Sequence, residues 1–191
     1  MLKDADVEFM LEAYRYAEKH ATDPSTQNGA VLVAFRPSPL LGTRSYLDYS
    51  NVQGRIVAEG ANCFPRGVKD LPERWARPAK YMRVEHAERN CIYAAARDGV
   101  ATLGLIMYAP WIACSDCARA IIQSGISEVI GHKPCPDSIQ HIENPNGSWD
   151  DSIAVGISML EEAGVKVRYL EGKLDPTDSI SIRRNGHIYH P

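Results

Sequence analysis

Apolar and polar positions along the first third of the chain predict one helix followed by two strands. Residues 6–20 repeat apolar side chains at helical spacing, which indicates an amphipathic helix. The run 29–35 (GAVLVAF) is continuously apolar and is typical of a strand buried on both faces. A turn-rich excursion at 36–55 leads to a second short strand at 56–59. Because no helix joins these two strands, we expect them to be antiparallel.

The remainder of the chain alternates helices with strands. A long irregular stretch at 60–83 comes first, and such loops inside a compact domain are usually functional. Strands connected by helices are expected to be parallel and buried, so the pattern predicts an α/β fold with three layers (α/β/α) and a mixed, roughly five-stranded sheet. Residues 1–171 form the predicted domain, and 172–191 form a polar C-terminal tail, either an interface arm or a loose end. The predicted helices are 85–97, 115–124 and 150–163, and the predicted strands are 103–109, 128–132 and 165–170, with a further loop at 133–147.

Composition narrows the class of protein. The 191 residues are 45% hydrophobic and 24% charged, which suits a single globular domain and excludes disorder as the main state. A net charge of −3 argues against a protein that coats nucleic acid. No apolar run approaches the ~18–20 residues of a membrane span, and the first residues lack the pattern of a signal peptide. We therefore expect a cytoplasmic protein that uses neither a membrane nor a nucleic acid as partner.

Two short motifs carry the candidate chemistry. His86-Ala87-Glu88 begins a predicted helix, and Cys114-Ser115-Asp116-Cys117 begins the next one, after a strand. Cysteines at a helix N-terminus are stabilised as thiolates by the helix dipole and by unpaired backbone N–H groups. One imidazole and two thiolates supply three ligands for Zn²⁺ and leave a position open for water. Glu88 can then move protons without binding the metal, which is the set of groups needed for hydrolysis at an electrophilic carbon.

Other interpretations of the same residues remain open. A Cys-x-x-Cys pair after a strand is also typical of redox proteins, although a redox pair has no use for His-x-Glu. A histidine at a helix start is, taken alone, more often a core or capping residue. A closed structural zinc site needs a fourth ligand, and Cys91 is a poor choice because it points roughly 140° away from His86 on the same helix. The candidates for that fourth ligand are Cys63, Cys91, Cys135 and His132.

Four segments of the chain have the pattern of a known family. They are residues 23–31 (D-P-S-T-Q-N-G-A-V), 62–67 (N-C-F-P-R-G), 86–90 (H-A-E-R-N) and 114–126 (CSDCARAIIQSGI). On these segments the chain resembles the zinc-dependent deoxycytidylate (dCMP) deaminase family of the cytidine deaminase superfamily, from about residue 7 to residue 170. The superfamily signature is H-x-E followed by paired cysteines, with the glutamate as proton shuttle.

The resemblance implies a cytidine-deaminase-like fold and a role for each matching residue. His86, Cys114 and Cys117 are implied to bind Zn²⁺, and Glu88 to carry protons to N3 of cytosine and to the departing ammonia. It also implies that Asn62 binds the sugar and that the backbone of Ala87 contacts the base. The implied activity is hydrolysis of dCMP to dUMP and ammonia, which supplies dUMP for thymidylate synthesis. Members of the family are commonly homo-oligomers, often hexamers, and are regulated by dCTP and dTTP.

Several positions depart from the family pattern. Ala113 replaces the usual proline before the first cysteine, so the loop over the base is expected to differ, and we include Ala113 among the substrate-binding residues. Asn28 replaces a valine, and Ala61 and Cys63 replace the aromatic residue and the glycine that usually flank Asn62. Deaminases of 5-substituted dCMP, free cytidine or tRNA adenosine therefore remain alternatives, as does a catalytically silent zinc module that binds nucleotides.

Cations in the long loop are the sequence's candidates for binding a 5′-phosphate. Arg66 is the first choice because it lies in the segment expected to contact the sugar, and arginine binds phosphate through two N–H groups. The other cations of the loop are Lys69, Arg74, Arg77, Lys80 and Arg83.

Overall fold

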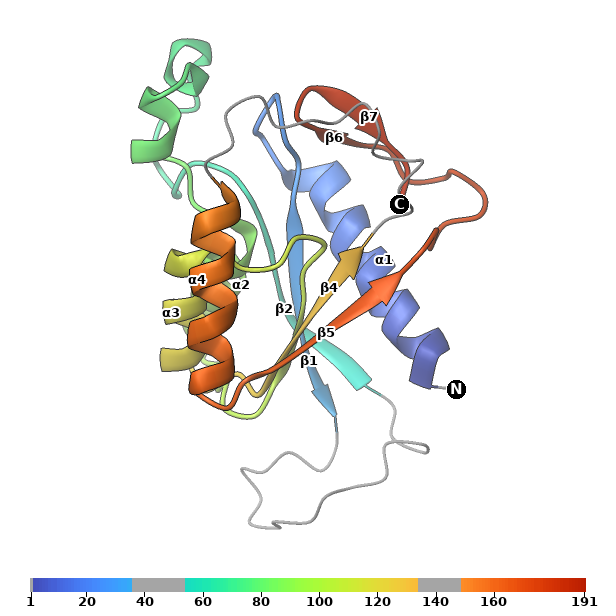
Figure 1. Ribbon diagram of the computed structural model, residues 1–191. Helices are drawn as coiled ribbons and strands as arrows, with labels where there is room; N and C mark the ends of the chain where they lie inside the picture. Colours follow the sequence, from blue (N-terminus) through green and yellow to red (C-terminus); the bar gives the residue numbers. More distant parts are fainter. Residues whose placement is uncertain (1, 36–53, 134–148) are drawn as a thin grey trace.

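The computed structural model describes residues 2–35, 54–133 and 149–191, which form a five-stranded sheet between two layers of helices (Figure 1). Helix α1 covers one face of the sheet, and α2, α3 and α4 cover the other. The three-layer prediction is confirmed. The helices are α1 (Leu2–His20), α2 (Ala87–Arg97), α3 (Ser115–Gln123) and α4 (Trp149–Glu162), with 3₁₀ turns η3 (Pro72–Trp75) and η4 (Ala79–Met82). The strands are β1 (Gly29–Phe35), β2 (Gly54–Ala61), β3 (Ile106–Tyr108), β4 (Glu128–Lys133), β5 (Lys166–Glu171), β6 (Ile182–Arg184) and β7 (His187–Tyr189).

Strand order in the sheet is β2-β1-β3-β4-β5. Strand β1 is antiparallel to both β2 and β3, whereas β3, β4 and β5 are parallel. The antiparallel pairing of β1 with β2 and the parallel pairing of β3, β4 and β5 agree with what the connections between the strands predict. The third strand is shorter than predicted, because residues 101–105 turn before the chain enters β3. The excursion at 36–55 and the loop at 133–147 lie almost entirely outside the described residues.

Side chains of β1 alternate between the two hydrophobic cores, one on each face of the sheet. Ala30 and Leu32 pack against the α2–α4 layer, and Val31 and Val33 pack against α1. Successive side chains of a strand point to opposite faces, so a wholly apolar strand fits only where both faces are covered.

Two glycines bring helices close to the segments that carry the candidate chemistry. A Cβ on Gly60 of β2 would lie 2.4 Å from the carbonyl oxygen of Ala87, at the start of α2. A Cβ on Gly156 of α4 would lie 2.6 Å from the carbonyl oxygen of Ala113. Neither contact tolerates a side chain, so the two glycines set how closely α2 meets the sheet and α4 meets the cysteine loop.

Residues 172–191 are packed onto the domain and do not form a loose tail. Strands β6 and β7 form an antiparallel hairpin whose turn residues, Asn185 and Gly186, have φ of 50° and 86°. Ile182 and Tyr189 are buried in the same core as α1. Charged residues in this segment interrupt the alternation of apolar and polar side chains that would predict a strand. Its packing against α1 therefore appears only in the folded structure. None of the helices in the described residues combines the length and the apolar character that a membrane span requires.

Candidate metal centre and substrate pocket

The two motifs meet because each stands at the start of a helix that packs on the same face of the sheet. His86 is the N-cap residue of α2 and Cys114 is the N-cap residue of α3, both with extended backbone. Arg89 joins the two helices through ion pairs with Glu85 and with Asp116, the latter at 3.6 Å. The side chain of Asn90 donates to the carbonyl oxygen of Ala61 at 2.8 Å, which fixes α2 to the end of β2.

The donor atoms of His86, Cys114 and Cys117 have the spacing of zinc ligands. The Nδ1 atom of His86 lies 3.5 Å from the sulfur of Cys114 and 3.4 Å from the sulfur of Cys117. Zinc bonds of about 2.3 Å to sulfur and about 2.0 Å to nitrogen, at tetrahedral angles, separate the two donors by roughly 3.5 Å. Both nitrogen–sulfur separations fit a tetrahedral zinc ion, and all three donor atoms lie within 4.8 Å of one another.

Protonation of the cysteines agrees with this use. Hydrogen bonds with Cys117 and His86 lower the pKa of Cys114 to about 4, against the opposing effect of burial. The pKa of Cys117 is raised, mainly by its hydrogen bond with Cys114 and by burial. A cysteine with a lowered pKa binds a metal readily as a thiolate, and metal binding favours the thiolate form of its neighbour as well.

Glu88 lies beside the donor group, and one oxygen of its carboxyl group has no partner among the described residues. The residue is 2% exposed, and the oxygen in question is Oε2. Burial raises the pKa of Glu88, while the charge of His86 lowers it. A buried carboxyl group with a raised pKa and an unused oxygen is suited to accept and release a proton.

The described residues offer no fourth ligand to close the site. In the described part of the chain, one group of three or more metal-ligating side chains lies close enough to hold a metal ion, and it consists of His86, Cys114 and Cys117. His132 is unsuitable, because its Nε2 donates to the carbonyl oxygen of Gly172 at 2.7 Å and its Nδ1 accepts from the hydroxyl of Tyr14 at 2.7 Å. Cys135 lies outside the described residues. The arrangement favours the open, catalytic type of zinc site over the closed structural type.

A cavity of about 640 Å³ opens in front of the donor group. Its walls include Glu88, the loop that follows β3 at Trp111, His132 at the end of β4 and Tyr169 in β5. Ligands of α/β sheets commonly bind at the carboxyl ends of parallel strands, and this volume lies within the usual range for small-molecule sites.

Two of the predicted substrate-binding residues line the cavity. Ala87 and Asn62 are both buried in its wall. The side chain of Asn62 already bridges the loop before β1, since its Oδ1 accepts from the backbone N–H of Asn28 and its Nδ2 donates to the carbonyl oxygen of Thr26, each at 2.7 Å. One hydrogen of Nδ2 remains for a ligand, so the sugar contact stays a prediction.

The other two predicted residues do not reach the cavity. Arg66 is exposed, and Ala113 is fully buried against α4. Among the six loop cations, only Arg77 and Lys80 line the cavity. Asn28, which replaces the family's valine, also lines it, and the Oδ1 atom of Asn28 is buried without a partner in the described part of the chain.

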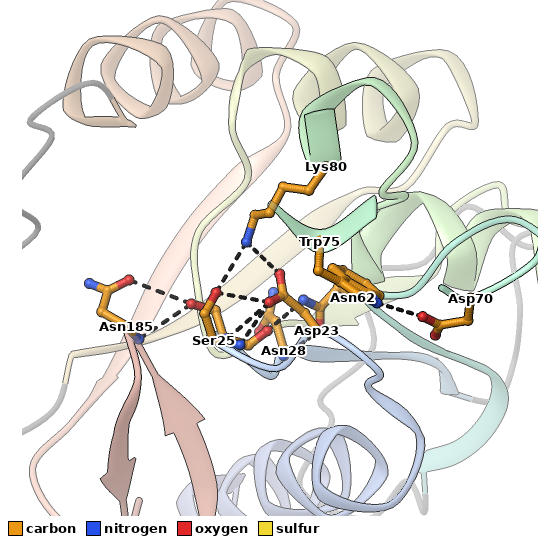
Figure 2. Close-up of polar contacts among 9 residues, drawn as sticks. Asp23, Ser25, Asn28, Asn62, Asp70, Trp75, Lys80 and Asn185 are labelled. Carbon is orange, nitrogen blue, oxygen red and sulfur yellow. Dashed lines mark hydrogen bonds and ion pairs between the residues drawn. The ribbon is translucent and has the colours of Figure 1, made fainter. Parts of the chain in front are cut away.

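Lys80 is committed to a buried ion pair beneath the cavity. Figure 2 shows its ammonium group between the carboxylate of Asp23, at 2.8 Å, and the hydroxyl of Ser25, at 3.1 Å. Asp23 also accepts from the backbone N–H groups of Ser25 and Thr26. This network joins η4 to the loop before β1, so two walls of the pocket are held together.

Sequence reasoning missed the residues that the C-terminal hairpin contributes to the pocket. Arg184 and Asn185 both line the cavity. The available signal was the dipeptide Asn185-Gly186, since Asn-Gly between two strand-like runs is the strongest short-range mark of a hairpin.

Comparison with known proteins identifies the family. The family model for the cytidine and deoxycytidylate deaminase zinc-binding region matches residues 50–133. A curated relative, an uncharacterized deaminase in the luxG 3′ region of Aliivibrio fischeri, is 34% identical over 148 residues, which cover 78% of this chain and 82% of the relative. The chain belongs to the cytidine and deoxycytidylate deaminase family. It is thus a deaminase whose matched region is zinc-binding, and the zinc prediction is confirmed at this level.

Other relatives of this deaminase are named deoxycytidylate deaminases. Those of Mus musculus and Homo sapiens are each 34% identical over 128 residues, which cover 64% of this chain and 61% of each relative. This deaminase therefore spans about three fifths of the length of those two enzymes. Among solved structures, the dCMP deaminase of cyanophage S-TIM5 in complex with dCMP and dUMP has a TM-score of 0.56 at 20% identity, with 85% of this chain and 94% of that chain covered. That likeness confirms the deaminase fold.

Proposed function

We propose that this deaminase hydrolyses dCMP to dUMP and ammonia. The observation that carries the proposal is the free oxygen of buried Glu88 beside the His86, Cys114 and Cys117 donor group, at the base of a cavity large enough for a nucleotide. The names of the mammalian relatives support dCMP as the substrate.

The proposed metal ligands are His86, Cys114 and Cys117. When bound there, zinc supplies the Lewis acidity that makes water nucleophilic near neutral pH. The rest of the chemistry belongs to the protein. Glu88 accepts the proton of the attacking water, delivers it to N3 of cytosine and then transfers a proton to the departing amine. A C–O bond forms at C4, the C4–N bond breaks, and ammonia leaves.

The pocket walls orient the ring for this proton transfer. The backbone of Ala87 lies in the wall next to Glu88, and Trp111 and Ile112 border the same space ahead of Cys114. Since these groups are held by α2 and by the loop after β3, a bound ring keeps a constant distance from the Glu88 carboxylate.

The assembly and regulation of the enzyme are carried over from the family resemblance. On that basis the protein is a cytoplasmic homo-oligomer, a hexamer by analogy, that responds to dCTP and dTTP. Light scattering of the purified protein and rate measurements with each triphosphate test these two expectations.

A side-by-side assay tests the activity. Purified protein should contain about one zinc per chain and release ammonia from dCMP faster than from deoxycytidine, CMP, dCTP or a tRNA anticodon stem-loop. Faster deamination of the stem-loop would favour an adenosine deaminase of tRNA. Zinc-loaded protein that binds dCMP but releases no ammonia would favour a silent binding module.

A further inference from the structure

The cationic side chains that line the cavity differ in whether they are available to bind an anionic ligand. Lys80 is paired with Asp23, and both ring nitrogens of His132 are hydrogen-bonded within the protein. His86 belongs to the metal donor group. Among the described residues that line the cavity, this leaves Arg77, which is exposed, and Arg184, which is half-buried.

Arg184 is a half-buried cation without a carboxylate partner. No ion pair or hydrogen bond to its guanidinium is formed by the described residues. Its guanidinium carbon lies 4.9 Å from the ring centroid of Trp111 and 5.7 Å from that of Tyr189. Burial accordingly lowers the pKa of Arg184. Stacking occupies the faces of a guanidinium and leaves its in-plane N–H groups available for a bidentate contact.

Arg184 lines the same cavity as His86, Glu88 and Cys114. Trp111 precedes Cys114 by three residues, so the stacked guanidinium borders the loop that carries a metal donor. A cytosine amino group must lie at the metal donors, and the 5′-phosphate is at the other end of the nucleotide. Both ends therefore have a partner within one cavity.

The hairpin holds Arg184 firmly in the wall. The backbone N–H of Gln27 donates to the carbonyl oxygen of Arg183 at 2.8 Å, and the backbone N–H of Gly186 donates to the carbonyl oxygen of Ser25 at 2.7 Å. Figure 2 shows Asn185 beside the loop that carries Ser25. These bonds fix the backbone on both sides of Arg184, and the contacts with Trp111 and Tyr189 restrict its side chain. A restricted side chain loses less freedom when it binds a ligand, so its affinity is greater.

We propose that Arg184 binds the phosphate monoester of the substrate, and that the C-terminal hairpin thereby makes this deaminase selective for a nucleotide over a nucleoside. This inference rests on the proposed function, and it assigns the phosphate to a residue outside the matched zinc-binding region, in place of Arg66. Geometry, stacking and the lack of a carboxylate partner carry it.

The test compares Arg184→Gln with Arg183→Gln, an exposed neighbour on the same strand. With zinc-loaded protein, Arg184→Gln should lower kcat/KM for dCMP roughly 10- to 100-fold, mostly through KM, and leave deoxycytidine within about twofold. Arg184→Lys should recover only part of the kcat/KM for dCMP that Arg184→Gln loses, since lysine lacks the planar guanidinium that makes a bidentate contact. Arg183→Gln should match the wild type. An equal loss on both substrates, or no loss, would overturn the inference.

A binding measurement separates this inference from the proposed function. Titration calorimetry of zinc-loaded protein with dUMP and with deoxyuridine should show a preference for dUMP that Arg184→Gln removes. If the wild type fails to deaminate dCMP yet keeps this Arg184-dependent preference, the proposed activity is wrong and the phosphate site stands. If dUMP and deoxyuridine bind equally to the wild type, the phosphate site is wrong whatever the activity.

Discussion

The side-chain oxygen of Asn62 accepts a hydrogen bond from the backbone N–H of Asn28 at 2.7 Å, across a separation of 34 residues. With the bond from Asn62 Nδ2 to Thr26, this contact joins the loop after β2 to the loop before β1. The same loop before β1 is bonded to the C-terminal hairpin. Asn62 therefore supports two walls of the substrate pocket as well as lining it.

Replacing Asn62 with alanine should destabilise the fold by roughly 1–3 kcal/mol, because it leaves the buried N–H of Asn28 and the partly buried carbonyl oxygen of Thr26 without their partner. Urea denaturation measures the change. Arg66→Ala, an exposed substitution in the same loop, should stay within about 0.5 kcal/mol of the wild type. It should also leave kcat/KM for dCMP unchanged, and a large rise in KM would return the phosphate contact to Arg66.

Lys80→Met should be among the most destabilising single changes, at about 3–5 kcal/mol, because it leaves the carboxylate of Asp23 buried without its counter-ion. The double variant Lys80→Met with Asp23→Asn should recover part of that loss. Unfolding free energies of the two single variants and the double variant give the coupling energy. Additive losses would show that the two side chains do not interact energetically.

Glu88→Gln should bind zinc normally and lose turnover by roughly 10²- to 10⁴-fold, since an amide cannot carry the proton. Metal analysis and ammonia release measure the two properties on one sample. The exposed Glu73→Gln serves as the matched control and should keep full activity. An active Glu88→Gln enzyme would exclude Glu88 as the proton carrier.

Cys114→Ser should lose zinc and thermal stability together, because metal binding and folding are coupled. A chelator should lower the Tm of the wild type towards that of the variant and leave the Tm of the variant unchanged. Cys63→Ser, which alters a cysteine outside the donor group, should retain both metal and Tm. Retention of tightly bound zinc by Cys114→Ser would rule out this cysteine as a ligand.

Acid should weaken the fold partly through His132. Burial lowers the pKa of this histidine from 6.5, so the folded protein holds it in the neutral form that bonds Tyr14 and Gly172. The stability that this preference contributes is present above about pH 6.5 and is lost as the pH falls through the lower pKa of the folded state. Between about pH 8 and about pH 5, the unfolding free energy of His132→Gln should therefore fall less than that of the wild type. His187→Gln, at an exposed position of the hairpin, should follow the wild type.

The sequence by itself determined the order of the α-helices and strands up to β5 and the direction of those strands, and it proposed the metal donors. These features follow from local rules. Wholly apolar runs form buried strands, and the connection between two strands decides whether they are parallel. The spacing of two short motifs also predicted that His86, Cys114 and Cys117 come together, with Glu88 beside them, and the structure places these side chains next to one another.

Only the tertiary structure decided which polar side chains complete the pocket. Lys80 pairs with Asp23 across 57 residues, and Tyr14 bonds His132 across 118 residues. No local pattern specifies such partners, because packing of the helices and of the hairpin chooses them. For the same reason Arg66, which is close to Asn62 in sequence, points to solvent, whereas Arg184 at the far end of the chain lies in the cavity wall.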